Sequence, residues 1–331
     1  MQSDDVGARR LWGGANILVT GARGFVGRRL VRHLAGLGAT VSQLVHSPNA
    51  FGNDDEALTH AGPRDRLIQA AVTDFKTVQE VINKRGISTV FHLAALNANR
   101  GTKVSPYALF EANVRGTYTV LEACRMATKA PQIVVLLSRE AEHCFDPLRT
   151  KKIHPYAASK ASAELIATSF ADTFGLRVVA LRTGNIYGEG DLNWDRLIPL
   201  TIRSFFMGQC PVMRGAMHER RDYIHVDDVV TACVAAATMR VQSGGAAGTI
   251  RLTSGFEAST AEIVLKLANA IGRYDLVPST VAKSIHEPSR SKTTCVQESG
   301  VLDWSSKTDI DDGLVATVRW YQRYLARTCF D

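Results

Sequence analysis

A glycine-rich turn between an apolar strand and an amphipathic helix limits the fold of this chain more than any other feature. The segment ANILVTGARGFVGRRLVRHLAGLGATVSQLVHS contains the turn. Ile17–Val19 form the predicted strand before it, and Leu30, Val31 and Leu34 follow it at helical spacing. Val41–Val45 form the next predicted strand. This order of strand, turn, helix and strand is typical of the first half of a dinucleotide-binding unit.

The alternation of strands and helices continues for about half of the chain. Further strands are predicted at Thr89–Ala95, Gln132–Ser138 and Arg177–Arg182, and helices at Tyr107–Met126 and Tyr156–Phe174. The pattern predicts an α/β protein with a Rossmann-type doubly wound parallel sheet. The regular spacing is lost after residue 182, where short mixed segments with prolines and glycines follow. We therefore expect a smaller C-terminal substrate-binding lobe.

Composition restricts the remaining classes. The 331 residues are 45% hydrophobic and 21% charged, as in an ordinary globular protein. The first residues contain no signal-peptide core, and no apolar run approaches the roughly 20 residues that span a bilayer. The six cysteines are scattered without a CxxC pair, which favours reduced thiols in a cytoplasmic protein and no metal site. The net charge of +7 does not form one long block, so we expect no nucleic-acid partner.

The turn TGARGFVG sets Gly21, Gly24 and Gly27 at three-residue spacing. Glycine lets the backbone approach a pyrophosphate, whose charge then lies at the helix N-terminus. A purely structural turn is the alternative. The position after the first strand and before an amphipathic helix favours nucleotide binding.

The end of the second strand bears on the choice between NAD and NADP. An NAD site usually has a carboxylate there for the ribose hydroxyls, but this strand ends in Val45, His46 and Ser47. Arg23, inside the glycine turn, could meet a ribose phosphate instead of remaining a solvated loop cation. The cofactor is predicted to be NADP or NAD, with NADP favoured.

The segment HPYAASKASAELI places Tyr156 and Lys160 on one face of a predicted helix, four residues apart. A phenol with its ordinary pKa of about 10 is a poor base at neutral pH. An ammonium group one turn away favours the phenolate, which can then accept a proton during hydride transfer. An ordinary exposed helix is the alternative. The preceding strand ends in Ser138, which supports the catalytic interpretation.

These motifs together resemble those of the extended short-chain dehydrogenase/reductases, in the NAD(P)-dependent nucleotide-sugar epimerase/dehydratase family. The resemblance runs from about Asn16 to Tyr324 and rests on TGARGFVG, FHLAA, NVRGTYTVLEA, YAASK, LRTGNIYGEGD and RRDYIHVDDVV. It implies an enzyme with an NAD(P)-binding Rossmann domain over residues 14–183 plus about 222–252. The nucleotide-sugar-binding lobe would then comprise residues 184–221 plus 253–331.

The resemblance also implies roles for individual residues. Tyr156 would be the acid/base, Lys160 its partner, and Ser138 the hydroxyl that binds the reacting sugar oxygen. The candidate cofactor-binding residues are Gly21, Arg23, Gly24, Phe25, Val26, Gly27, His46, Leu93, Ala94, Ala95, Asn113, Tyr156 and Lys160. The candidate substrate-binding residues are Ser138, Arg139, Asn185, Arg196, Arg221 and Arg290. Asn185 and Arg221 match positions that usually meet the diphosphate.

The string Ser138, Arg139, Glu140 bears on the reaction type. Family dehydratases follow the hydroxyl with an Asp-Glu pair, and arginine cannot supply the proton that elimination of water needs. Glu140 remains a candidate catalytic residue. The stretch GNIYGEGDLNWDRLIP is similar to that of CDP-glucose 4,6-dehydratases and favours the opposite conclusion. An alignment on EHC would move the hydroxyl position to Arg139, but counting from the strand start favours Ser138.

The sequence therefore predicts an epimerase or 4-ketoreductase acting on a nucleotide sugar by hydride transfer at a sugar carbon. The alternatives are a nucleotide-sugar 4,6-dehydratase, a reductase of a non-nucleotide carbonyl substrate, and a non-catalytic cofactor-sensing protein on the same fold. In relatives, the helices that correspond to Tyr107–Met126 and Tyr156–Phe174 pack across a two-fold axis. We expect a homodimer with no membrane partner.

Overall fold

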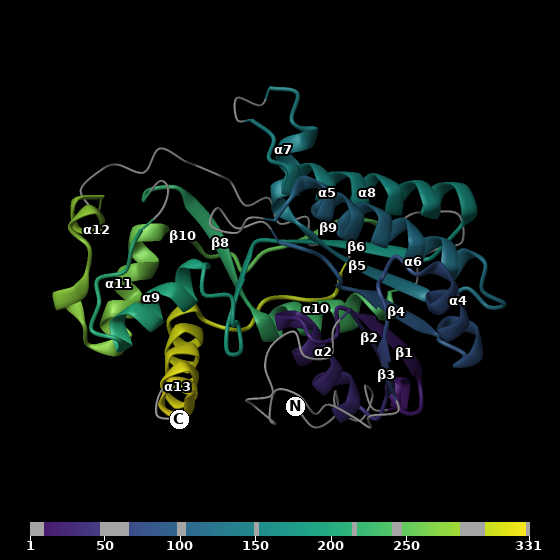
Figure 1. Cartoon of the computed structure of the whole chain (residues 1–331), viewed down its shortest axis with the longest axis horizontal. Coiled ribbons are helices and arrows are strands. Elements are labelled where there is room, and N and C mark those ends of the chain that lie inside the picture. The colour runs from purple at the N-terminus through teal and green to yellow at the C-terminus, as the bar shows by residue number, and fades with distance from the viewer. Residues whose placement is uncertain are drawn as a thin grey trace.

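The computed structural model describes residues 10–46, 66–97, 104–148, 152–213, 217–239, 247–284 and 302–328. Within them the chain forms a larger α/β body and a smaller body of helices and short strands beside it (Figure 1). The N-terminal glycine turn and the catalytic helix predicted from the sequence both belong to the larger body.

The larger body is built on a seven-stranded sheet in which every paired neighbour is parallel. The strand order is β3-β2-β1-β4-β5-β6-β9. The strands are β1 (Asn16–Thr20), β2 (Thr40–Val45), β3 (Leu67–Gln69), β4 (Thr89–His92), β5 (Gln132–Ser138), β6 (Val178–Thr183) and β9 (Ala247–Leu252). The predicted doubly wound sheet is confirmed. Its direction of growth reverses between β1 and β4, the place where such sheets bind ligands at their carboxyl ends.

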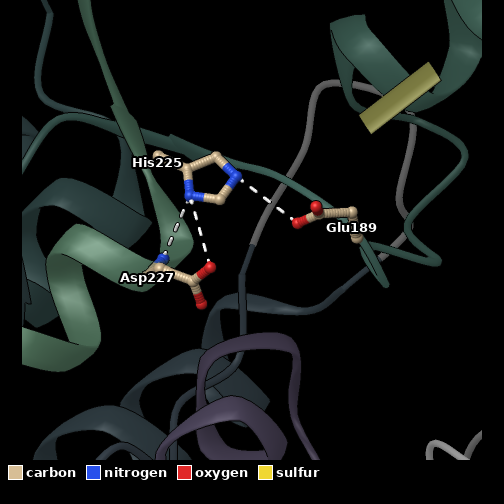
Figure 2. A group of neighbouring side chains, drawn as sticks. All are labelled: Glu189, His225 and Asp227. Atoms are coloured by element: carbon tan, nitrogen blue, oxygen red, sulfur yellow. Dashed lines mark hydrogen bonds and ion pairs between the residues drawn. The ribbon is translucent and has the colours of Figure 1, made fainter. Parts of the chain in front are cut away.

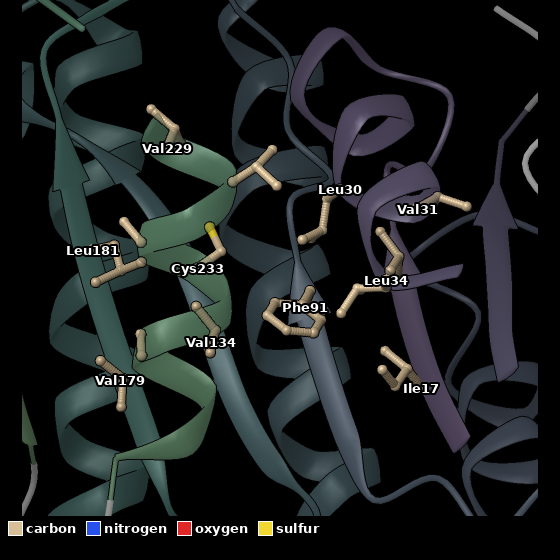
Figure 3. Close-up of a cluster of buried hydrophobic side chains, with 14 of the residues drawn as sticks. Ile17, Leu30, Val31, Leu34, Phe91, Val134, Val179, Leu181, Val229 and Cys233 are labelled. Atoms are coloured by element: carbon tan, nitrogen blue, oxygen red, sulfur yellow. The ribbon is translucent and has the colours of Figure 1, made fainter. Parts of the chain in front are cut away.

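Helices cover both faces of this sheet (Figure 1). They are α2 (Phe25–Gly36), α4 (Phe75–Lys84), α6 (Gly116–Arg125), α8 (Pro155–Phe174) and α10 (Val226–Thr238). The short helices α5 (Pro106–Phe110) and α7 (Glu142–Phe145) pack on α8. Side chains of α2 and α10 pack on one face around Ile17, Phe91 and Val179 (Figure 3). Side chains of α4, α6 and α8 pack on the other face around Leu18 and Val90. Burial on both faces accounts for the near-continuous apolar strands in the sequence.

The smaller body has its own sheet, order β10-β8-β7, and its own apolar core. Its elements are β7 (Asn185–Tyr187), β8 (Arg220–His225), β10 (Glu257–Ser259), α9 (Leu197–Phe206), α11 (Thr260–Ile271), the 3-10 turn η4 (Tyr274–Leu276), α12 (Ser279–Ser284) and α13 (Ile310–Thr328). Strand β8 runs directly into α10, which covers the large sheet. The chain therefore passes between the two bodies at this junction and again between β9 and β10.

Two predicted elements differ from those observed. The helix expected over Tyr107–Met126 is interrupted by a π-helical turn, η2 (Glu111–Arg115), between α5 and α6. Such turns add one residue to the helical repeat and often occur at functional sites. The strand expected over Thr89–Ala95 ends at His92, because the next residues turn to meet β1: Ala94 N donates to Thr20 Oγ1 over 3.2 Å. Asp74 caps α4 by accepting from Thr77 N.

Two further observations concern membrane-spanning helices and the cysteines. In the described part of the chain, no helix is both long and apolar enough to cross a membrane. Cys124, Cys144, Cys210 and Cys233 are free thiols, and Cys295 and Cys329 lie outside the described residues.

Candidate active site

The glycine turn is closely fitted to the end of β4. Gly21 has φ +67°, and a Cβ atom there would lie 2.7 Å from Ala94 N. A Cβ on Gly27 would lie 2.1 Å from Gly21 O. Any side chain at either position would displace backbone atoms. The turn therefore carries no side chain at these two positions, and a ligand can approach its backbone closely.

The first turn of α2 is open to an anion. Gly24 is the N-cap and offers no side chain to the first N–H groups of the helix. Unpaired N–H groups and the helix dipole together favour a phosphate at this end. The bare turn and the open helix N-terminus fit the pyrophosphate of a dinucleotide.

The other predicted cofactor residues lie around the same switch point. Gly21 N donates to Leu44 O over 3.2 Å, which places the turn beside the end of β2. His46 follows that end and is exposed, and Arg23 is half-buried in the turn. Leu93 N donates to Thr20 O at the end of β4. Phe25 and Val26 begin α2, and Ala95 follows Ala94.

Asn113 connects the π-helical turn to the catalytic helix. Its side chain accepts from Leu96 N over 2.8 Å and donates to Leu96 O and to Ser159 Oγ. The residue is almost fully buried. Asn113 therefore holds the segment after β4 against α8, beside the catalytic pair. These hydrogen bonds indicate that Asn113 supports the position of both elements.

Ser138, Tyr156 and Lys160 come together at the carboxyl end of β5. Ser138 ends the strand, and its hydroxyl acts on the Tyr156 side chain and lowers the pKa of the phenol. Lys160, one turn further along α8, donates from Nζ to Leu136 O over 3.3 Å. Burial lowers the pKa of the Lys160 ammonium to about 8. The three side chains that the sequence motifs predict to act together therefore lie near the carboxyl end of β5.

Burial and three neighbouring groups act on the phenol of Tyr156. Burial is the largest effect and raises the pKa of the phenol. Ser138 and the positive charge of Arg196 lower that pKa, whereas Glu140 raises it.

Arg139 and Glu140 begin a 3-10 turn, η3 (Arg139–Ala141), and their side chains face different partners. Arg139 lies 3.8–3.9 Å from the carboxylates of Glu142, Asp222 and Glu257. These distances are too long for hydrogen bonds. Glu140 is about half-exposed and lies 4.0 Å from Arg221.

The predicted diphosphate residues share one face of the small sheet. Asn185 begins β7 and pairs with Tyr223 on β8, where it lowers the pKa of the Tyr223 phenol. Arg221 precedes Tyr223 by two residues and so points to the same face of β8. Its Nη2 donates to Glu219 over 3.1 Å. Arg290 lies outside the described residues.

Several acidic residues near the site have no motif that identifies them in advance. Asp222 accepts hydrogen bonds from Ser254 and Thr253, and Glu189 lies beside His225 and Arg29. Figure 2 shows the His225 ring between Glu189 and Asp227. Only the charge pattern of RRDYIHVDD and GEGD indicates them in the sequence.

Glu189, His225 and Asp227 are close enough for a metal ion, since their ligand atoms lie within 4.8 Å of one another. Arg29 donates to both carboxylates, to Glu189 over 2.8 Å and to Asp227 over 2.6 Å. Nδ1 of His225 faces Asp227 N over 3.3 Å and accepts from it. The negative charge is therefore partly compensated by a guanidinium, and Arg29 fastens α2 to the start of α10 and to the loop after β7.

Comparison with known proteins identifies the family. Residues 17–247 match the "NAD dependent epimerase/dehydratase family". The chain is 28% identical to a dTDP-glucose 4,6-dehydratase of Mycolicibacterium smegmatis, over 92% of this chain and 93% of that protein. It is also 28% identical to a dTDP-4-dehydro-6-deoxy-D-allose reductase of Streptomyces bikiniensis, over 95% and 98% of the two chains.

One similar protein has been solved with two ligands bound. "MoeE5 in complex with UDP-glucose and NAD" is 27% identical, with a TM-score of 0.75, covering 94% of this chain and 100% of that one. The protein described here belongs to the NAD-dependent epimerase/dehydratase family, within the extended short-chain dehydrogenase/reductases. It is an enzyme of this family that uses NAD or NADP. The comparisons support NAD-dependent modification of nucleotide sugars as its class of reaction.

Proposed function

We propose that this enzyme epimerises a nucleotide sugar or reduces a 4-keto nucleotide sugar. The relatives act on dTDP sugars by name, and MoeE5 was solved with UDP-glucose. The observation that carries the choice of reaction is the environment of Arg139. Its guanidinium faces three carboxylates, among them Asp222 and Glu257 of the small sheet.

The catalytic step follows from the side chains at the end of β5. The bound nicotinamide would accept or supply hydride. Tyr156, as phenolate, would take the proton of a sugar hydroxyl as its carbon is oxidised, and would return a proton to the oxygen when a ketone is reduced. Ser138, at the end of β5, would hold that sugar oxygen. Lys160 would supply positive charge from the next helical turn.

The substrate lobe would bind the nucleotide half. We assign it residues 184–221 plus 253–331, and the Rossmann domain residues 14–183 plus about 222–252. Asn185 and Arg221 share one face of the small sheet, close to Glu140. An amide and a guanidinium there suit a diphosphate, because guanidinium groups bind phosphate through two parallel hydrogen bonds. We propose Arg196 as a further substrate contact.

Dehydration at carbons 4 and 6 needs a second acid beside the base. Arg139 stands where family dehydratases have the aspartate, and a guanidinium does not release its proton. Glu140 remains as the one carboxyl of the Ser138–Glu140 string. Without the second acid, loss of a hydroxyl has no proton source in this string.

Products from a panel of sugars would test the proposal. The purified enzyme is incubated with UDP-, dTDP-, GDP- and CDP-linked hexoses and their 4-keto derivatives, with NAD or NADP(H), and the products are identified by NMR. We expect a C-epimer from a hexose or a 4-hydroxy sugar from a ketone. A 4-keto-6-deoxy sugar formed from a hexose would establish the dehydratase alternative.

The same proposal includes NADP preference and a homodimer. The end of β2 carries no carboxylate, and Arg23 and the exposed His46 flank the glycine turn there. The helices proposed for the two-fold contact expose large apolar side chains: Tyr107 on α5 is 75% exposed and Leu165 on α8 is 60% exposed. Exposed apolar side chains of this size favour an interface on these helices.

A further inference from the structure

His92 is a buried titratable side chain at the switch point of the large sheet. It ends β4, pairs in register with Thr20 at the end of β1, and is 3% exposed. Thr20 is the residue before Gly21, the first glycine of the turn. Nδ1 of His92 lies 2.8 Å from Thr20 Oγ1, and Nε2 lies 3.1 Å from Thr117 Oγ1 on α6. The imidazole therefore joins the strand before the glycine turn to a helix on the sheet.

The donors around the ring fix the direction of both hydrogen bonds. Ala94 N donates to Thr20 Oγ1 over 3.2 Å, which leaves the Thr20 hydroxyl proton for Nδ1 of the imidazole. The Thr117 hydroxyl donates to Asn113 O over 2.6 Å and so accepts from Nε2. Burial lowers the pKa of His92 to about 3, and a neutral imidazole carries one N–H and one bare nitrogen. The ring proton therefore lies on Nε2.

From Thr117 the hydrogen bonds continue to α8. Asn113 Nδ2 donates to Ser159 Oγ over 2.9 Å, and the Ser159 hydroxyl donates to Tyr156 O over 2.8 Å. The side chains in this series are called the His92 network here: Thr20, His92, Thr117, Asn113 and Ser159. Each of these residues is at most 3% exposed. Because a buried polar network with all its members paired is rigid, it holds the start of β1's turn and the start of α8 together.

The segment Leu93–Leu96 runs between the same two places. It leaves β4 beside the glycine turn, where a Cβ on Gly21 would lie 2.7 Å from Ala94 N. It ends at Asn113, which accepts from Leu96 N over 2.8 Å and donates to Leu96 O. A dinucleotide whose pyrophosphate lies at the glycine turn follows this segment to bring its nicotinamide to Tyr156. His92, at the start of the segment, therefore lies where the two ends of the cofactor site are joined.

We propose that His92 is a positioning residue: its neutral imidazole, bonded to Thr20 and Thr117, fixes the segment Leu93–Leu96 and α8 relative to the glycine turn. It thereby sets the position of the nicotinamide against Tyr156 without touching the reacting atoms. Histidine suits this position because its donor and acceptor lie on opposite sides of a rigid ring, whereas glutamine carries both at the end of a flexible chain. The inference rests on the proposed function where it takes Tyr156 as the acid/base.

The tautomer of His92 is measured on the full chain without cofactor or sugar. The histidine rings are labelled with 15N, and the His92 signals are assigned by their loss in His92→Gln. Couplings to the ring protons identify the nitrogen that carries the proton. We expect a protonated Nε2 and a bare Nδ1 near neutral pH, and a shifted Nε2 signal in Thr117→Val, which replaces the accepting hydroxyl with a methyl group. A proton on Nδ1 overturns the proposal.

Kinetics separate positioning from a purely structural role. On an accepted sugar, Thr117→Val should lower kcat by about ten- to a hundredfold and change KM and the cofactor Kd by less than about threefold, because a displacement of about 1 Å can cost a hundredfold in rate. Thr117→Ser keeps the hydroxyl and should recover most of kcat. Ser162→Ala is the matched control, since its hydroxyl donates to Ala158 O on α8 outside the His92 network. Wild-type kcat in Thr117→Val, or an equal loss in Ser162→Ala, overturns the proposal.

The fluorescence of bound NADH or NADPH tests the same geometry without a sugar. At saturation, the nicotinamide emission of Thr117→Val should differ from that of the wild type, and Ser162→Ala should match the wild type. Altered emission in Thr117→Val together with no product from any nucleotide sugar would overturn the proposed function and leave the role of His92 in place. Unchanged emission in Thr117→Val would overturn that role.

Discussion

Nη1 of Arg139 lies 3.9 Å from Oδ2 of Asp222, a buried carboxylate oxygen that accepts no hydrogen bond from the described residues. Asp222 belongs to β8 of the small sheet, whereas Arg139 follows Ser138 at the end of β5. The residue that stands in the dehydratase aspartate position is thus turned toward the small sheet. Glu140 remains as the acid of this turn.

The first prediction concerns Glu140. Epimerisation or keto reduction needs only Ser138, Tyr156 and Lys160, so Glu140→Gln should lower kcat less than tenfold. General acid–base groups contribute roughly a hundred- to ten-thousand-fold. Steady-state kinetics on the accepted sugar distinguish the two cases. A thousandfold lower kcat at unchanged KM would make Glu140 a base for elimination and favour the dehydratase.

Tyr156→Phe should abolish turnover while cofactor binding persists. The phenol moves the proton, whereas the bare glycine turn and the open end of α2 hold the cofactor. We expect kcat to fall by about a thousandfold, within the usual range for such groups, and the Kd for the cofactor from calorimetry to change less than threefold. A variant with near-normal kcat would remove Tyr156 from the mechanism.

The sequence predicted the sheet, and it predicts the catalytic set, because both depend on local patterns. Apolar strands, the glycine spacing and the Tyr156–Lys160 interval are each visible within a few residues. The partners of Arg139 and Arg196 were not predicted, since Asp222 and Asp191 are brought to them by the crossing between the two bodies. The π-helical turn at Glu111–Arg115 was missed because helical spacing continues on both sides of it.

The cofactor preference depends on one arginine. If Arg23 meets a ribose phosphate beside the end of β2, NADP(H) binds more tightly than NAD(H), and Arg23→Ala removes the difference. A charged phosphate contact of this kind contributes about 1.5–3 kcal/mol, or roughly ten- to a hundredfold in Kd. Calorimetry with both cofactors measures it, and Arg32→Ala on α2 serves as a control. A clear preference of the wild-type enzyme for NAD would contradict the assignment.

The oligomeric state follows from the exposed apolar residues of α5, α6 and α8. Tyr107, Tyr118 and Leu165 expose 75%, 43% and 60% of their surface. Sedimentation velocity at micromolar concentration should show a dimer, and Leu165→Glu should shift it to monomer because it buries an unpaired charge. Leu11→Glu, at an exposed position outside these helices, should remain dimeric. A monomeric wild-type protein would reject this surface as the interface.

The last prediction uses the cost of burying Lys160. Burial lowers the pKa of its ammonium from 10.5 to about 8, so the unfolded chain holds the proton more tightly than the folded protein. Stability therefore rises with pH between about 8 and 10.5, and the buried charge costs stability below that window. A shift of this size corresponds to a cost of about 3 kcal/mol near neutral pH. Lys160→Met, which keeps the bulk of the side chain, should unfold at higher denaturant concentration than wild type at pH 7 and lose this pH dependence. Lys84→Met, at an exposed position, should follow the wild-type profile. Parallel profiles for wild type and Lys160→Met between pH 8 and 10.5 would show that the ammonium is not desolvated in the folded enzyme.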